Sequence, residues 1–385
     1  MQLTGIELVQ VDLPFRQAIG TAAGVHRVRP LLFVRVVTGE GEGWGECAAL
    51  AEGTAVDPAL AAVRQAAVDL GVRRLFEATA ARGGQLPSAA GVAQLFGGTP
   101  VDRMLAATFE MAVADVELRA AGRSLASDLG VTEGFEAMAV GAVVGIPQDH
   151  DLGALRREVE AVVRTGVSRL RLKIEPGWEV VPVGAVRADH PDLVLQVDAN
   201  GSFSLGDEDV AALSRLAGFD VVCIEQPLPP ADLVAHAHLA RLLPLPICLD
   251  ESLSTPRRVA DALRNGSCAM ACLKPARLGG LRATRAAHAA CAEAGVPVFV
   301  GGFFEAGLGR SSNLALAARL SQDATGLVSD VGDPMEYLAI DPCGYPPVRA
   351  GWVRVPGGPG VGSPPEGTVL AKLEAQRRWF PATYT

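Results

Sequence analysis

Residues 168–199 read SRLRLKIEPGWEVVPVGAVRADHPDLVLQVDA, and this stretch decides the fold. Two short, largely aliphatic runs, at 168–174 and 193–199, flank a segment long enough for a helix. A strand, a helix and a second strand in this order are typical of a parallel βα unit. The stretch therefore predicts one repeat of an α/β architecture.

The same pattern continues on both sides of this stretch. Six further strand candidates lie at 139–146, 220–226, 245–251, 270–275, 296–302 and, more weakly, 326–330. Eight parallel strands with intervening helices predict a (β/α)8 barrel, of the modified TIM type, over residues 131–334. Before it, an alternating apolar–polar pattern up to about residue 50 and a helical periodicity from Asp102 to Ala121 predict an α+β capping domain at 1–130. We expect the tail, about 335–385, to complete that domain.

Composition narrows the class of ligand. The chain has 385 residues, 49% of them apolar, and its 43 acidic and 34 basic side chains give a net charge of −9. This charge repels nucleic acids and anionic membranes, so we expect a small-molecule partner.

The N-terminal stretch resembles no leader and no apolar run reaches 18 residues, so we expect a cytoplasmic protein. Seven cysteines without a CxxC pair indicate reduced core residues.

Charged residues end five successive strand candidates: Lys173, Asp198, Glu225, Asp250 and Lys274. Their spacings of 25, 27, 25 and 24 residues each match about one βα unit. Since the strands of such a barrel are parallel, their C-terminal ends meet at one mouth. The spacing therefore predicts that all five side chains converge there.

Asp198, Glu225 and Asp250 form a candidate metal site. Three carboxylates in one mouth repel one another and raise their pKa values unless a cation neutralises them. Oxygen ligands supplied by carboxylates favour Mg²⁺, with Mn²⁺ as an alternative, and the lack of His or Cys ligands argues against zinc. A small carboxylate substrate would occupy the remaining positions.

Lys173 and Lys274 lie on either side of the three carboxylates. Arg171 is two residues before Lys173 and therefore on the same strand face. We expect this arginine and the metal to lower the pKa of the lysine, so that a free amine is available as a base. A proton beside a carboxylate is weakly acidic, and its removal requires positive charge around the enediolate that forms.

At these residues the chain resembles the enolase superfamily, and within it the o-succinylbenzoate synthase and N-succinylamino acid racemase family of the muconate-lactonising subgroup. The matching stretches are Arg171–Trp178, Asp198–Gly201, Ile224–Pro227, Leu249–Ser252, Leu273–Gly280, Gly301–Ser311, Pro14–Arg16 and Gly43–Glu46. The resemblance implies that Lys173 takes the α-proton. It further implies that Lys274 is a cation beside the enediolate or the acid/base on the opposite face, and that Arg277 acts on Lys274. Arg171, Asn200, Gly302 and Glu305 are further candidates for substrate binding or support.

The resemblance implies o-succinylbenzoate synthase, a lyase of menaquinone biosynthesis, as the first choice of function. N-Succinylamino acid racemase is the alternative, and one site could carry both activities. Dipeptide epimerase and muconate-type cycloisomerase are less favoured. Ser329-Asp330-Val331 lacks the paired Asp-x-Asp expected of a dipeptide-binding site. A mandelate-racemase type of site is set aside, because no histidine follows His288. The resemblance also leads us to expect a homo-oligomer.

Three positions depart from the family pattern. Arg171 replaces the first lysine of Lys-x-Lys, Val143 stands where a serine is expected, and Cys272 stands where an asparagine is common. Arg171 keeps its charge but does not shuttle protons. A non-catalytic barrel that binds a metal and a carboxylate is the remaining rival, yet such a binder would gain nothing from two lysines beside the metal.

Overall fold

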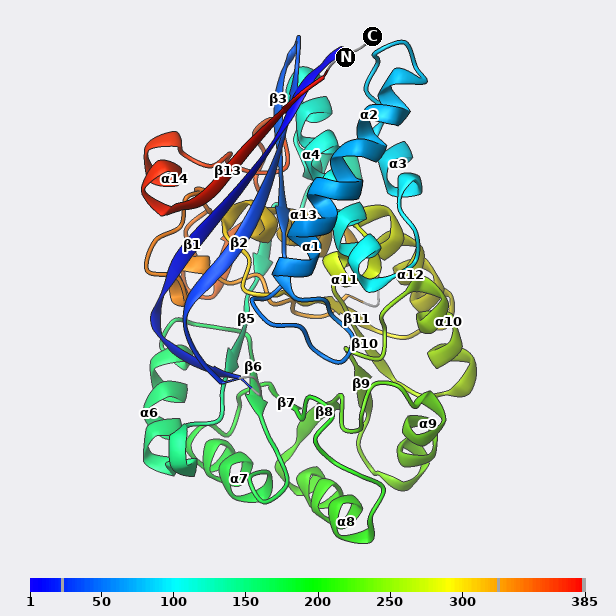
Figure 1. Cartoon of the computed structure of the whole chain (residues 1–385). Helices are drawn as coiled ribbons and strands as arrows, with labels where there is room; N and C mark the ends of the chain where they lie inside the picture. Colours follow the sequence, from blue (N-terminus) through cyan, green and yellow to red (C-terminus); the bar gives the residue numbers. More distant parts are fainter. Residues whose placement is uncertain (22–23, 324–325, 383–385) are drawn as a thin grey trace.

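The computed structural model describes residues 1–21, 24–323 and 326–382. An antiparallel sheet with its helices lies above a curled parallel sheet that helices surround (Figure 1). The predicted fold class, a modified TIM barrel with an α+β capping domain, is confirmed. The exact division near residues 130 and 334 remains a proposal.

The sheet of the capping part joins the two ends of the chain. It contains β1 (Leu3–Thr21), β2 (Gly24–Thr38), β3 (Gly41–Cys47) and, from the tail, β13 (Glu374–Pro381). The strand order is β13-β1-β2-β3, and β13 pairs antiparallel with β1. Its helices are α1 (Leu60–Ala66), α2 (Val72–Ala80), α3 (Ala89–Val92), α4 (Pro100–Ala120) and α5 (Leu125–Leu129).

Helix α4 is the central helix of this part, and its start is encoded locally. Thr99 accepts a hydrogen bond from the Asp102 N–H while the Asp102 side chain accepts one from the Thr99 N–H, which forms a capping box. The helix packs closely against β3 because Gly43 and Gly45 have no side chain. A Cβ on either glycine would lie 2.3 or 2.1 Å from backbone atoms of α4. The Gly-Trp-Gly-Glu motif therefore sets the distance between helix and sheet.

Seven parallel strands form the barrel sheet, in sequential order. They are β5 (Gly141–Val144), β6 (Arg169–Lys173), β7 (Leu195–Asp198), β8 (Val221–Glu225), β9 (Ile247–Leu249), β10 (Met270–Leu273) and β11 (Val298–Val300). The helices that follow are α6 (Leu152–Val163), α7 (Val180–Asp189), α8 (Asp207–Arg215), α9 (Leu233–Leu242), α10 (Pro256–Asn265), α11 (Pro275–Leu278), α12 (Leu281–Glu293), α13 (Gly307–Leu320) and α14 (Gly367–Leu373).

The predicted eighth strand, at 326–330, is not a regular strand. Its residues form isolated bridges, Gly326 to Val298 and Ser329 to Val140, so the segment still connects the two edges of the sheet. The Val300 N–H bonds to the Ser329 hydroxyl at 3.0 Å instead of to a backbone carbonyl. This side-chain acceptor interrupts the backbone ladder.

The first predicted barrel strand, at 139–146, is divided between two sheets. Only β5 belongs to the barrel, whereas β4 (Ala137–Ala139) pairs antiparallel with β12 (Trp352–Arg354) of the tail. The two-residue periodicity continues through both pieces, so the sequence offered no sign of this division.

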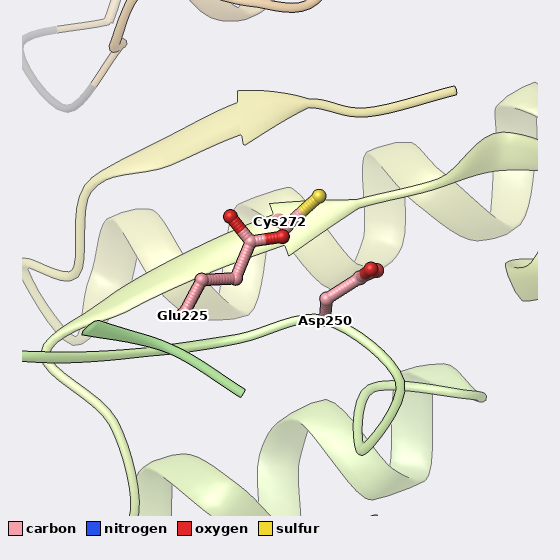
Figure 2. A group of neighbouring side chains, drawn as sticks. All are labelled: Glu225, Asp250 and Cys272. Atoms are coloured by element: carbon pink, nitrogen blue, oxygen red, sulfur yellow. The ribbon is translucent and has the colours of Figure 1, made fainter. Parts of the chain in front are cut away.

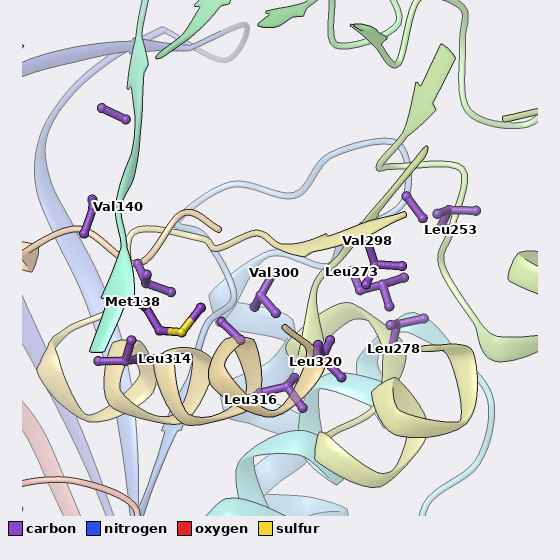
Figure 3. Close-up of a cluster of buried hydrophobic side chains, with 14 of the residues drawn as sticks. Met138, Val140, Leu253, Leu273, Leu278, Val298, Val300, Leu314, Leu316 and Leu320 are labelled. Atoms are coloured by element: carbon purple, nitrogen blue, oxygen red, sulfur yellow. The ribbon is translucent and has the colours of Figure 1, made fainter. Parts of the chain in front are cut away.

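The core of the barrel lies between its strands and the surrounding helices. Val298 and Val300 of β11 and Leu273 of β10 are buried in one cluster with Leu316 and Leu320 of α13 (Figure 3). This cluster holds the strand ends rigidly in place. Among the helices of the described residues, none is both long and apolar enough to cross a membrane.

Candidate active site

Five charged residues occupy the C-terminal ends of five neighbouring strands. Lys173, Asp198 and Glu225 are the last residues of β6, β7 and β8, and Asp250 and Lys274 directly follow β9 and β10. Lys173 pairs in register with Asp198, and Asp198 with Glu225. Neighbouring residues in register on parallel strands point the same way. The structure therefore brings these side chains to one mouth of the barrel.

Each lysine contacts one carboxylate of this row. Lys173 Nζ lies 2.6 Å from Asp198 Oδ2, and Lys274 Nζ lies 2.8 Å from Asp250 Oδ2. Burial alone would lower the pKa of Lys274, but the negative charge of Asp250 raises it above the ordinary value. Asp250, the nearest partner of Lys274, thus favours the protonated form of this lysine.

Arg171 binds the middle carboxylate rather than standing free beside Lys173. Its guanidinium donates to both oxygens of Glu225, at 3.1 and 2.8 Å, and also pairs with Asp330. Burial raises the pKa of Glu225 well above its ordinary value, Arg171 opposes this shift, and the charges of Asp198 and Asp250 add to it. The expected like-charge repulsion thus acts on Glu225.

Asp250 behaves in the opposite way. Burial would raise its pKa, but the cations Arg277 and Lys274 lower it below the ordinary value. Arg277 donates to Asp250 at 2.5 Å and to both oxygens of Asp57 at 2.8 and 2.7 Å. The expected contact of Arg277 with Lys274 therefore runs through their shared carboxylate. Asp57, which no sequence pattern marked, lies in the loop between β3 and α1.

One group of side chains has the geometry to hold a metal ion, and it includes two of the three predicted ligands. Glu225, Asp250 and Cys272 are all buried, and each offers a ligand atom within 4.8 Å of the others (Figure 2). Asp198 is not part of this group, because its carboxylate faces Lys173. Two carboxylates in reach of one ion, with a third on the next strand, suit a divalent cation. The predicted ligand set contained no cysteine, whereas this group includes Cys272, which the sequence marked only as a departure from the family pattern.

Asn200 connects the base candidate to a further carboxylate. Its Oδ1 accepts from Lys173 Nζ at 2.6 Å, and its Nδ2 donates to Glu251 at 3.0 Å. Burial raises the pKa of Glu251, and the neighbouring charges of Asp250 and Asp198 raise it further. Glu251 was missed from the sequence, although its place directly after Asp250 was a visible signal.

Gly302 and Glu305 lie in the loop after β11, whose Phe303 ring contacts Lys274. A Cβ on Gly302 would lie 2.5 Å from Glu305 Oε2, so only glycine allows that carboxylate to approach. Glu305 pairs with Arg310 at 3.0 Å and accepts from Asn313 at 3.0 Å. These contacts hold the loop, and they give Glu305 no direct contact with Lys173 or Lys274.

Val143 and Phe303 lie beside the charged residues on two sides of the mouth. Val143 of β5 pairs in register with Arg171, yet 40% of it is exposed. Its side chain therefore offers an apolar surface on the same strand face as Arg171. On the other side, Lys274 Nζ lies 4.7 Å from the centre of the Phe303 ring, a cation–π contact.

Comparison with known proteins assigns the family. The model of the enolase C-terminal domain-like family matches residues 154–367, which is more than half of the chain. The chain belongs to the enolase superfamily. It is an enzyme of this superfamily that acts on a small molecule, and superfamily members generally use a divalent metal ion.

Individual members of the enolase superfamily match over almost their whole length. An N-succinylamino acid racemase from Amycolatopsis is 37% identical over 99% of this chain and 100% of its own. An o-succinylbenzoate synthase from Geobacillus kaustophilus is 33% identical over 92% of this chain and 91% of its own. Among solved structures, a probable mandelate racemase from Alicyclobacillus acidocaldarius is 32% identical, with a TM-score of 0.87 over all of both chains.

The mandelate-type site has no counterpart in this member of the superfamily. The last histidine in the sequence, His288, lies on α12 and is buried there against Asp323. A histidine on a helix outside the strands cannot reach a substrate in the mouth. Lys173 and Lys274 are therefore the side chains of the mouth that we consider for proton transfer, since the arginines Arg171 and Arg277 stay protonated.

Proposed function

We propose that this enzyme is an o-succinylbenzoate synthase, which removes water after abstraction of the proton beside a carboxylate. The observation that supports this most is a row of three carboxylates with Lys173 at one end and Lys274 at the other. An α-proton beside a carboxylate requires both a base and concentrated positive charge for its removal. Relatives named o-succinylbenzoate synthase match at 33% and 37% identity.

Mg²⁺ is the proposed cofactor, with Mn²⁺ as an alternative, held by Asp198, Glu225 and Asp250. Carboxylate oxygens prefer such hard ions. When bound, the ion supplies positive charge beside the substrate carboxylate. Burial raises the pKa values of Glu225 and Glu251. The positive charge of a bound ion would favour the ionised form of both acids.

In the proposed reaction Lys173, as a free amine, takes the α-proton. Asp198 and Asn200, each 2.6 Å from its Nζ, hold that nitrogen in place. The proton then leaves with the substrate hydroxyl as water, so Lys173 returns to the amine and no redox partner is needed. Lys274 remains an ammonium ion, fixed by Asp250 and the Phe303 ring, and provides charge on the opposite flank.

N-Succinylamino acid racemisation is the second candidate, and the same pair of lysines favours it. Racemisation requires a proton donor on the face opposite the base. Lys274 lies on the opposite flank of the carboxylates and is held protonated by Asp250. A relative with this activity is 37% identical over nearly the whole chain.

The dipeptide-epimerase alternative gains no support from the site. Asp330, the one acid of Ser329-Asp330-Val331, pairs with Arg169 and Arg171. It is thus not free to bind the amino group of a dipeptide.

We further propose that the protein is a cytoplasmic homo-oligomer and that it acts in menaquinone biosynthesis.

The test is to measure both activities on one purified sample with Mg²⁺. We expect water loss from the hydroxy-cyclohexadiene carboxylate precursor of o-succinylbenzoate, which makes the ring aromatic, and, more slowly, inversion of N-succinylamino acids. In deuterated water, inversion should be accompanied by exchange of the α-proton. Faster inversion than dehydration would favour the racemase, and absence of both reactions and of exchange would contradict the proposed site.

A further inference from the structure

Cys272 distinguishes the candidate metal site of this chain from the pattern that the family resemblance leads us to expect. It lies on β10, where Ala271 pairs in register with Leu249, so Cys272 and Asp250 are the next residues on two adjacent strands. Both side chains point into the barrel. Asparagine, the residue that the family resemblance leads one to expect here, offers a neutral amide, whereas cysteine offers sulfur.

The thiol lies within reach of an ion held by the carboxylates. Sγ of Cys272 and one oxygen each of Glu225 and Asp250 are all within 4.8 Å of one another (Figure 2). All three residues are 1% exposed. Ligands about 2.0–2.3 Å from one ion lie at most about 4.5 Å apart, so small side-chain rotations suffice for a shared ion.

The surroundings of Cys272 leave room for the sulfur and add no competing partner. A Cβ on Gly301, on the next strand end, would lie 2.5 Å from Cys272 Sγ. Glycine at 301 therefore gives the thiol its space. In the part of the chain that the structure describes, no hydrogen bond involves this thiol.

We propose that Cys272, together with Glu225 and Asp250, is a ligand for borderline ions such as Zn²⁺ and Co²⁺, which compete with Mg²⁺ for the site. Thiolate sulfur favours these ions, whereas Mg²⁺ prefers oxygen and gains little from it. On binding, a metal–sulfur bond forms and the thiol proton leaves to solvent, without any change of oxidation state. This inference rests on the proposed metal-dependent function, and it adds that Zn²⁺ inhibits the enzyme.

The experiment uses Co²⁺ as a spectroscopic probe on the purified, chelator-treated full chain. Wild-type protein should show visible d–d bands and also a sulfur-to-cobalt charge-transfer band in the near ultraviolet. Cys272→Ser, which is almost isosteric, and Cys272→Asn should keep the d–d bands and lose the charge-transfer band. The matched control Cys248→Ala, a buried thiol on β9 outside the group of ligands, should keep both.

Affinities give a second readout. Competition titrations should show that the two Cys272 variants bind Zn²⁺ about tenfold or more weakly than wild type, with Mg²⁺ affinity nearly unchanged. Bound Co²⁺ without the charge-transfer band in wild type would overturn the role of Cys272 and leave the proposed function standing. A charge-transfer band that persists in Cys272→Ser would also overturn it. Absence of any Co²⁺ binding would overturn both the inference and the proposed metal site.

Discussion

At the scale of single residues, the use of lysine supports the proposed roles. Only three of the 34 basic Lys and Arg residues are lysine, namely Lys173, Lys274 and Lys372. Two of these three occupy the barrel mouth. A guanidinium stays protonated at all ordinary pH values, so only a lysine amine can accept the α-proton. Most basic residues of this chain are arginine, yet both positions where proton transfer is proposed are lysine.

Removal of the proposed base tests this directly. Lys173→Ala should lower kcat at least about 10²-fold, because general base catalysis is lost. Binding of Mg²⁺ and the far-ultraviolet circular dichroism should stay close to wild type. Lys372→Ala, an exposed lysine of α14, is the matched control and should be fully active. Near wild-type turnover in Lys173→Ala would refute the assignment.

Metal removal is the second test at this scale. Treatment with EDTA followed by gel filtration should abolish activity, since the carboxylates alone supply no positive charge to the substrate. Added Mg²⁺ or Mn²⁺ should restore it, and Ca²⁺, a larger ion, should restore less. Full activity in chelated protein, with metal content checked by mass spectrometry, would exclude a metal-dependent reaction.

At the scale of elements, buried acids from the capping part bind the N-termini of barrel helices. Glu110 of α4 accepts from the Arg282 N–H at the start of α12, and Glu46 of β3 accepts from the Gly309 N–H in the first turn of α13. Burial raises the pKa of Glu110 to about 7 and that of Glu46 to about 8. These contacts fix the two parts of the protein to each other.

The pKa of Glu110 predicts a pH-dependent stability. Burial raises the pKa of Glu110 in the folded state from 4.5 to about 7. The stabilisation that protonated Glu110 gives the folded state is therefore fully present below pH 4.5 and is lost as pH rises through 7. Glu110→Gln keeps one accepting oxygen and removes the charge. It should raise the free energy of unfolding at pH 8.5 by roughly 1–3 kcal/mol and change little at pH 4.5.

Urea unfolding at the two pH values measures this effect. Glu117→Gln, on the same helix but half-buried, is a suitable comparison and should give a smaller difference. If Glu110→Gln changes the free energy of unfolding equally at both pH values, the charge of Glu110 does not destabilise the folded state.

At the scale of the whole molecule, one ion-pair chain connects the capping part to the barrel mouth. Asp57 belongs to the loop between β3 and α1. This loop extends from the capping part toward the barrel (Figure 1). Its carboxylate binds Arg277, which in turn binds Asp250. All three residues are buried, so loss of one partner leaves an unbalanced charge inside the protein.

Asp57→Asn should therefore affect both stability and the site. We expect a loss of roughly 3 kcal/mol in the free energy of unfolding. Arg277 should then interact more strongly with Asp250, so that more Mg²⁺ is needed for half-maximal activity. Glu52→Gln, an exposed acid of the same loop, is the control. Thermal unfolding and Mg²⁺ titration of activity provide the measurements, and an unchanged Mg²⁺ requirement would show that Asp57 acts on stability alone.

The sequence by itself determined the barrel and the order of charges around its mouth. The reason is that the C-terminal ends of parallel strands all lie at the same edge of the barrel. Residues that are one βα unit apart in the sequence are therefore neighbours there. Lys173, Asp198, Glu225, Asp250 and Lys274 could thus be named without coordinates. Each of them ends a strand whose local pattern is visible.

Tertiary structure alone decided which partner each charge takes. Asp198 faces Lys173, Cys272 joins Glu225 and Asp250, and Asp57 reaches Arg277 from 220 residues away. Rotamers and long-range approach set these contacts, and no local periodicity encodes them. The eighth segment, 326–330, likewise closes the ring through isolated bridges, because a serine side chain competes with the backbone for its hydrogen bond.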